Sequence, residues 1–275
     1  MVVIHSIEDE RISSYRSLRD LSPRRNKAEE TVFVVENSKV IRRLLKSSCD
    51  VCSFFATAAY YEEFCGLLDA KNVPDEMRFV ADDTVMNAIV GFSLHEGVMA
   101  LAKAPQMPYL LDSLRSIEFP AVCLCGVIDA ENVGAIVRNC AAFGIRSLII
   151  DAASSSPYLR RAVRVSLGGI FALKVYQTDS VREALEELKQ RRPSLQRIAL
   201  ETRPDATLLP AVAVSEECII CFGSEAKGIP EEILHAVDTV ATIPMPAIGE
   251  FDAVNSLNVA SSTAIALYHL TLKSV

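Results

Sequence analysis

The second half of the chain alternates between apolar runs and amphipathic stretches. From residue 118 onward, short apolar runs are followed by segments whose apolar positions recur at helical spacing. The pattern predicts strands over 121–128, 147–151, 173–176, 197–200, 218–222 and 239–243, and helices over 132–143, 159–166, 181–191, 231–237 and 257–270. Strands that are apolar throughout and alternate with helices are typical of a parallel sheet covered on both faces. We therefore predict an α/β fold for 118–275, with ligands bound beyond the carboxyl ends of its strands.

The first hundred residues mix helical and strand periods. They predict helices over 11–21 and 37–46, and strands over 31–35, 51–57, 77–80 and 97–102. The segment 103–108, with two prolines, breaks both periods. We therefore expect a smaller N-terminal α/β domain over 1–104, a linker over 105–117 and a second domain over 118–275.

The overall charge is opposite to that of a protein that binds nucleic acid through bulk electrostatics. The 275 residues carry 28 Lys and Arg against 35 Asp and Glu, a net charge of −7. Between residues 11 and 46, however, ten basic residues face four acidic ones. This local excess is either a nucleic-acid-binding patch or an ordinary solvated helical face. The chain has neither a run of about 18 apolar residues nor a secretory pattern at its start, so we expect an intracellular, cytoplasmic protein without a membrane span.

The eight cysteines include two C-x-x-C pairs, which invite a zinc interpretation. Cys218 and Cys221 lie in a predicted strand, where residues three apart point to opposite faces and cannot share an ion. For Cys49 and Cys52, Cys65 is the only close further ligand. We therefore expect free buried thiols and no metal site.

The first two of three unusual loops follow predicted strands. In the loop from residue 129, Asn132 is suited to capping the next helix and Arg138 follows six residues later, although plain capping and a surface charge would explain both. The second loop runs from Gly223 through a polar tip to Gly228. It lacks the Lys-Ser/Thr pair of a phosphate loop, and the chain has no G-x-G-x-x-G fingerprint for a nicotinamide cofactor. The second loop could therefore hydrogen-bond a flat ligand through its backbone, or be a simple tight turn.

The third loop combines a strand end at 243–245 with the start of the last predicted helix. Ser256 is a plausible cap for that helix. Asn258 has poor helix propensity just inside it and therefore needs another explanation.

In this order the three loops resemble the three motifs of the SpoU (TrmH-like) branch of the SPOUT RNA methyltransferases. The family patterns are N-x-G-x-x-x-R, then G-x-E-x-x-G, then I-P-M followed by S-L-N-V. The matching residues here are Asn132, Gly134 and Arg138, then Gly223, Glu225 and Gly228, then Ile243, Pro244 and Met245 with Ser256, Leu257, Asn258 and Val259. The resemblance covers 118–272. It extends more loosely to 33–36 and 95–98, which look like the family's substrate-binding domain, a fold akin to a ribosomal protein.

The resemblance implies a homodimeric enzyme that transfers a methyl group from S-adenosylmethionine to a ribose 2′-hydroxyl of RNA. The additional N-terminal domain favours ribosomal over transfer RNA as the substrate. The resemblance also implies a C-terminal trefoil knot. The implied catalytic residues are Asn132, Arg138, Glu225, Ser256 and Asn258. The implied cofactor-binding residues are Phe222, Gly223, Ser224, Glu225, Gly228, Ile243, Met245, Ser256 and Leu257. For RNA binding we expect Arg24, Arg25, Lys27, Arg160, Arg161 and Arg164.

The sequence departs from the family pattern at three places. The segment 246–255 is longer than the usual spacing, Ala260 stands where serine is common, and Asn37 replaces a common glycine. Because a guanidinium rarely loses its proton, orienting the hydroxyl and the adjacent phosphate suits Arg138 better than acting as a base. Two alternatives stay open: a non-catalytic RNA-binding or ribosome-assembly protein that keeps the knot, and a base methyltransferase of the same superfamily.

Overall fold

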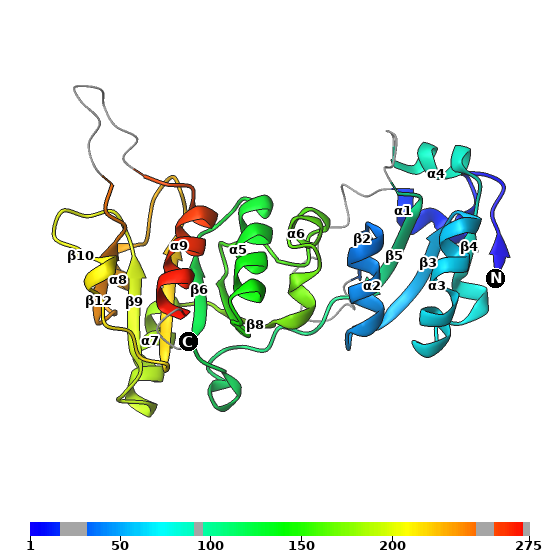
Figure 1. Cartoon of the computed structure of the whole chain (residues 1–275). Coiled ribbons are helices and arrows are strands. Elements are labelled where there is room, and N and C mark those ends of the chain that lie inside the picture. Colours follow the sequence, from blue (N-terminus) through cyan, green and yellow to red (C-terminus); the bar gives the residue numbers. More distant parts are fainter. Residues whose placement is uncertain (17–31, 91–95, 246–255, 272–275) are drawn as a thin grey trace, which may run out of the picture. The chain divides into compact units, whose positions relative to one another are not determined.

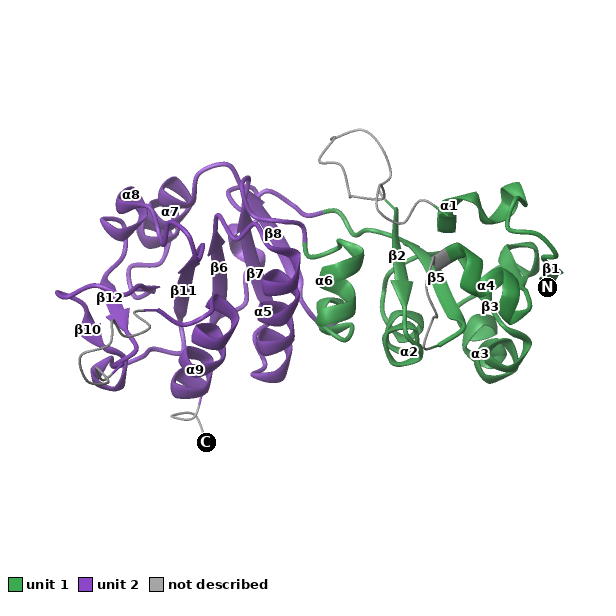
Figure 2. Cartoon of the chain, turned by 90° about the horizontal axis from the view of Figure 1, so that it is seen from above, with its two compact units in different colours: residues 1–106, 157–171 green, residues 107–156, 172–275 purple. Residues whose placement is uncertain are grey.

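The computed structural model describes residues 1–16, 32–90, 96–245 and 256–271. The chain divides into two compact units (Figure 2). Unit 1 comprises 1–106 and 157–171, and unit 2 comprises 107–156 and 172–275. No helix among the described residues has the length and apolar character needed to cross a lipid bilayer.

Unit 1 has a mixed sheet of five strands within its described part, in the order β1-β4-β3-β5-β2. Strand β5 runs antiparallel to both of its neighbours, β2 and β3. The strands are β1 (Val2–Val3), β2 (Val32–Glu36), β3 (Val51–Ala56), β4 (Arg78–Val80) and β5 (Val98–Lys103). The helices are α1 (Ser13–Arg16), α2 (Ser38–Lys46), α3 (Ala58–Ala70), α4 (Asp83–Val90) and α6 (Arg160–Val165). The predicted strands and the helix α2 are confirmed. The predicted helix over 11–21 is described only to residue 16.

Helices α3 and α4 were missed by the sequence analysis. In α3 only Phe64 and Leu68 are fully buried, so its apolar pattern is too sparse to stand out from the flanking sequence. Asn37, at the cap of α2, has a φ of 79°. Asparagine is among the few residues that tolerate this left-handed region, which accounts for its standing where glycine is common.

Unit 2 is an α/β layer structure, as the alternating pattern predicted. In its described residues a parallel sheet of seven strands has the order β10-β12-β9-β11-β6-β7-β8. Helices α5 and α9 cover one face, and α7 and α8 lie on the other (Figures 1 and 2). The strands are β6 (Ala121–Cys125), β7 (Ser147–Asp151), β8 (Lys174–Thr178), β9 (Gln196–Leu200), β10 (Thr207–Leu208), β11 (Cys218–Gly223) and β12 (Thr239–Thr242). The helices are α5 (Ala130–Ala142), α7 (Val181–Arg191), α8 (Glu231–Leu234) and α9 (Val259–Thr271).

Strand order decides where the three loops meet. Strand β11 lies between β9 and β6, with Cys221 opposite Cys123 and Ala199. Because all these strands are parallel, their carboxyl ends meet at one edge of the sheet. The three loops follow β6, β11 and β12, and β12 is separated from β11 only by β9, so the loops converge although they lie far apart in the sequence.

Residues of the expected linker pack into unit 2. Leu110, Leu114 and Ile117 belong to its buried core, and the Leu110 backbone N–H donates to the Gln177 carbonyl of β8. The long segment 246–255 lies outside the described residues. The knot stays a prediction.

Candidate active site

A cavity of about 110 Å³ opens at the carboxyl ends of the strands in unit 2. It is lined by Leu200, Glu201, Thr202, Phe222, Gly223, Ser224, Glu225, Gly228, Ile243, Met245, Ser256, Leu257, Val259 and Ser262. Every residue expected to contact a cofactor is among them. The structure thus gathers the expected cofactor residues of the second and third motifs around one cavity.

The two glycines of the second motif form a close backbone cradle. A Cβ added to Gly223 would lie 2.5 Å from the backbone nitrogen of Ile229. Gly228 itself has a φ of +65°, and a Cβ there would lie 2.9 Å from Cδ of Glu201. The loop closes through the Gly228 N–H, which donates to the Ser224 carbonyl at 2.8 Å. A side chain at Gly223 would collide with backbone and force the loop open, whereas one at Gly228 would be strained by the positive φ and would displace the Glu201 carboxylate. The cavity wall here therefore depends on glycine.

Three polar side chains from the three motifs form a hydrogen-bonded triangle. Asn132 Nδ2 donates to Glu225 Oε2 at 2.8 Å. Asn258 Nδ2 donates to Asn132 Oδ1 at 2.9 Å and to Glu225 Oε1 at 2.5 Å. Both carboxylate oxygens of Glu225, a cavity-lining residue, are therefore held by amide donors. The triangle fixes a negative charge at the wall of the cavity.

The helix caps differ from those expected, and this difference explains the triangle. Asp129, and not Asn132, caps α5, since its Oδ1 accepts from the backbone N–H groups of Glu131 and Asn132. The Asn132 amide is thereby left to reach Glu225. Ser256 does not cap α9, because the helix starts later than predicted. Asn258 is its cap, with Oδ1 accepting from the Ala260 N–H at 2.9 Å.

Arg138 is not brought to the cavity. Its side chain is exposed on α5, and the lining does not include it. Arg138 follows Asn132 by six helical residues, so the two Cα atoms lie about 9 Å apart along the helix axis and about 120° apart around it. Of the five expected catalytic residues, the structure therefore brings Asn132, Glu225, Ser256 and Asn258 together.

Among the described residues expected to bind RNA, none lines this cavity. Arg24, Arg25 and Lys27 fall outside the described residues. The other three lie in α6 of unit 1, where Arg160 and Arg164 both form ion pairs with Glu36, the latter at 3.2 Å. The Glu36 side chain is only 9% exposed, so both arginines compensate a buried charge. Arg161, on the same helix, is exposed.

Glu201 is the main site residue that the sequence analysis missed. It follows β9, lines the cavity and accepts through Oε2 from the backbone N–H of Ile229 at 2.7 Å. Its Oε1 accepts from the Thr202 N–H at 3.0 Å. A charged residue directly after a predicted apolar strand was the available signal. Leu200, Thr202, Val259 and Ser262 were missed as well, because nothing in their residue types marks them as wall residues.

Comparison with known proteins gives consistent matches. Residues 120–268 match the model of the SpoU rRNA Methylase family. An uncharacterized tRNA/rRNA methyltransferase of Mycobacterium tuberculosis is 29% identical over 268 residues, covering 96% of this chain and 89% of that protein. The 23S rRNA (guanosine-2′-O-)-methyltransferase RlmB of Shewanella oneidensis is 28% identical over 178 residues, covering 63% of this chain and 69% of RlmB. The crystal structure of an AdoMet-bound rRNA methyltransferase from Sinorhizobium meliloti has the same fold, with a TM-score of 0.79, 20% identity and coverage of 99% of this chain and 98% of that one.

Proposed function

Because the chain belongs to the SpoU rRNA methylase family, we propose that it transfers a methyl group from S-adenosylmethionine to a ribose 2′-hydroxyl of ribosomal or transfer RNA. The observation that carries this proposal is the Asn132–Glu225–Asn258 triangle at the wall of the cavity. It joins the first, second and third motifs into one unit. A chain that had kept the fold but lost catalysis would not need three mutually hydrogen-bonded polar side chains at the cavity wall.

The cavity suits the cofactor because its wall at Gly223 and Gly228 is backbone. Such a wall can approach a flat adenine ring and offer it peptide hydrogen bonds. When bound, S-adenosylmethionine supplies an electrophilic sulfonium methyl. The negative charge of Glu225, fixed by two amides, lies where it can attract the sulfonium or orient a hydroxyl. Ser256 offers a further hydroxyl at the same wall. In the transfer the ribose oxygen would take the methyl as the methyl–sulfur bond breaks, leaving S-adenosylhomocysteine, and the hydroxyl proton would pass to water.

We assign RNA binding to unit 1 together with the basic segment that includes Arg24, Arg25 and Lys27, and we favour ribosomal over transfer RNA as substrate. We further propose a homodimer and the family's C-terminal knot. The support for a dimer is the exposed apolar surface of α9, where Ile265 is 41% and Tyr268 57% exposed, about one turn apart. None of the eight cysteines, all within the described residues, forms a disulfide, which supports the proposed cytoplasmic location.

The test is methyl transfer by the full chain. Labelled S-adenosylmethionine is incubated with ribosomal and transfer RNA from a host strain lacking the gene, and the nucleosides are analysed by mass spectrometry. We expect label in 2′-O-methyl nucleosides. Label on a base would identify a base methyltransferase instead. Cofactor binding without transfer to any RNA would identify a non-catalytic RNA-binding protein.

A matched pair of glycine variants tests the cavity. Gly228→Ala places a methyl group against Glu201, whereas Gly144→Ala has a similar φ of +75° with nothing within 4 Å. Both variants carry the same backbone strain. We expect calorimetry to show that only Gly228→Ala loses cofactor affinity, by at least tenfold. Equal affinities in the two variants would contradict the proposed cofactor position.

A further inference from the structure

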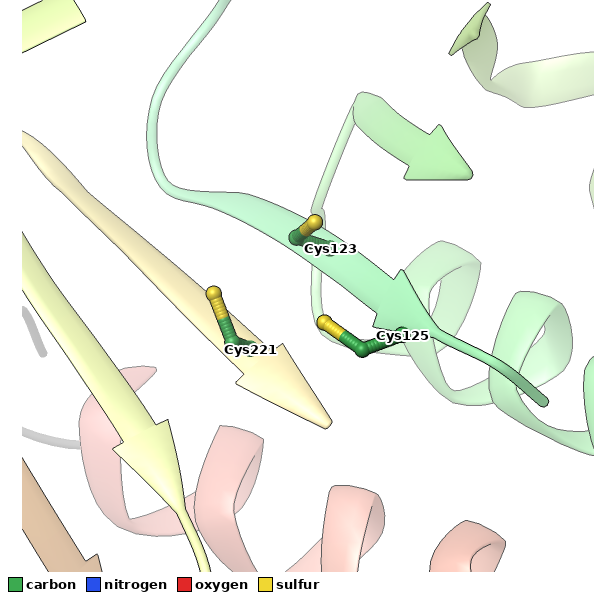
Figure 3. Close-up of side chains that lie close together, drawn as sticks. All are labelled: Cys123, Cys125 and Cys221. Carbon is green, nitrogen blue, oxygen red and sulfur yellow. The ribbon is translucent and has the colours of Figure 1, made fainter. Parts of the chain in front are cut away.

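Three cysteines lie side by side in the centre of the parallel sheet of unit 2 (Figure 3). Cys123 and Cys125 alternate along β6 and therefore point to the same face. Cys221 stands opposite Cys123 on the neighbouring strand β11. The three Sγ atoms all lie within 4.8 Å of one another. The C-x-C spacing at 123–125 differs from the C-x-x-C pattern on which the zinc interpretation was based, so the sequence did not predict this cluster.

The surroundings of the three thiols are apolar and closed. The cysteines are between 0% and 2% exposed and belong to the core under α7 and α8. Their neighbours in register are Ile149 beside Cys123 and Ala199 beside Cys221. Among the described residues, no histidine or carboxylate joins the three as a fourth ligand. The cluster therefore offers three sulfur ligands.

We propose that Cys123, Cys125 and Cys221 form a three-sulfur binding site for a trivalent thiophilic metalloid of the arsenite class. Three thiols and neutral As(OH)3 give As(SR)3 and three waters: three S–H and three As–O bonds break and three As–S bonds form. Arsenic keeps its oxidation state, so the step needs no oxidant or reductant. The product is neutral, which matters because an uncompensated charge in an apolar core is strongly unfavourable.

The need for a neutral product in the apolar core disfavours other soft ions. Zinc in structural sites takes four ligands, and with three thiolates it would carry one negative charge. Monovalent copper with three thiolates would carry two. The geometry needs a modest adjustment: arsenic bound to three sulfurs keeps a lone pair and is pyramidal, and bonds of about 2.3 Å with angles of about 100° place the sulfurs about 3.5 Å apart. From separations within 4.8 Å, the sulfurs need to close by at most about 1.3 Å.

The cluster is coupled to the cavity through β11. Cys125 stands opposite Gly223 in the strand register, and Cys221 precedes Gly223 by two residues. Drawing the three sulfurs together shifts both strand ends beneath the glycine cradle. We therefore expect occupation of the cluster to weaken cofactor binding. This coupling rests on the proposed function, whereas metalloid binding does not.

The binding test uses the reduced full chain with sodium arsenite. After desalting, native mass spectrometry should show one arsenic per chain with the loss of three hydrogens. X-ray absorption at the arsenic edge should show three sulfur neighbours. No retained arsenic, or fewer than three sulfur neighbours, would overturn the site, and this measurement needs no variant. Zinc binding as tight as arsenite binding would overturn the charge argument.

A matched pair of cysteine variants locates the site. Cys221→Ala should lower arsenite affinity at least tenfold. Cys218→Ala, equally buried on the same strand but on its opposite face, should bind like the wild type. Equal affinities would overturn the assignment, and Cys125→Ala replaces Cys221→Ala if circular dichroism shows that the latter is unfolded. Calorimetry with S-adenosylmethionine on arsenite-loaded protein tests the coupling, which an unchanged affinity would overturn while leaving the metalloid site intact.

Discussion

Asn258→Asp separates the two tasks of one side chain. Oδ1 of Asn258 caps α9, and Nδ2 donates to Asn132 and Glu225. Aspartate caps a helix as well as asparagine does, so the cap survives the substitution. The amide donor is replaced by an acceptor that carries a negative charge. The variant therefore keeps the helix start and breaks the triangle.

The size of the effect follows from the two hydrogen bonds that are broken and the repulsion that is added. A hydrogen bond to a charged partner contributes about 1.5–3 kcal/mol and one between neutral groups about 0.5–1.5 kcal/mol. The new carboxylate also faces Glu225, and two like charges about 4 Å apart repel by about 1 kcal/mol in water and about 4 kcal/mol at an effective dielectric constant of 20. Glu225 is exposed, so the lower values apply. A loss of about 3 kcal/mol corresponds to a rate about 100-fold lower.

The assay is single-turnover methyl transfer, accompanied by thermal unfolding. Asn139→Asp is the matched control: Asn139 Nδ2 donates to the Ala260 carbonyl at 2.8 Å, where α5 packs on α9 and away from the cavity lining. It should lower Tm and change the rate less than threefold. Asn258→Asp should lower the rate about 100-fold at a comparable loss of Tm, so lost stability alone does not account for its effect. A rate for Asn258→Asp within threefold of the wild type would refute the catalytic role of the triangle.

Three further predictions concern single side chains. Arg138→Ala tests the catalytic role that the family resemblance implies, because the structure leaves this side chain exposed and outside the cavity lining. That role predicts methyl transfer slower by about two orders of magnitude or more at unchanged cofactor affinity. Arg138→Lys should fail almost as badly if the guanidinium fork positions the substrate, and near-normal turnover of the alanine variant would exclude any catalytic role. Glu201→Ala removes the charge-assisted hydrogen bond from the Ile229 N–H and so releases the loop at Gly228. The loss of one such bond should weaken cofactor binding about tenfold in calorimetry, and an unchanged affinity would contradict this. Burial raises the pKa of Asp238, but hydrogen bonds from Arg197 outweigh it and lower that pKa to about 2. The folded pKa is thus below the unfolded value, so this stabilisation is present above about pH 4 and is lost as the pH falls toward 2. Thermal melts of Asp238→Asn should show a smaller loss of Tm across that range, and an identical pH profile would contradict the assignment.

Local patterns in the sequence determined the class of fold and the content of the site. Apolar runs and helical periods predicted the main strands and helices of unit 2, because side-chain burial on a strand or helix repeats at a fixed short interval. The second and third motifs, with Phe222 directly before the second, supplied the expected cofactor residues found in the cavity lining. The same reasoning failed at helix starts. Whether Asp129 or Asn132 caps α5 depends on which side chain has another partner, and the partner of Asn132 lies 93 residues away.

Only the tertiary structure decided which distant residues meet. The order β9-β11-β6 brings the second motif beside the first and places Cys221 opposite Cys123. The tertiary structure also leaves Arg138 exposed on α5, although Arg138 follows Asn132 by only six residues in the sequence. Strand order and register are set by the packing of whole apolar faces against helices from other parts of the chain. Periodicity describes one element at a time, so it contains no information about which two strands become neighbours.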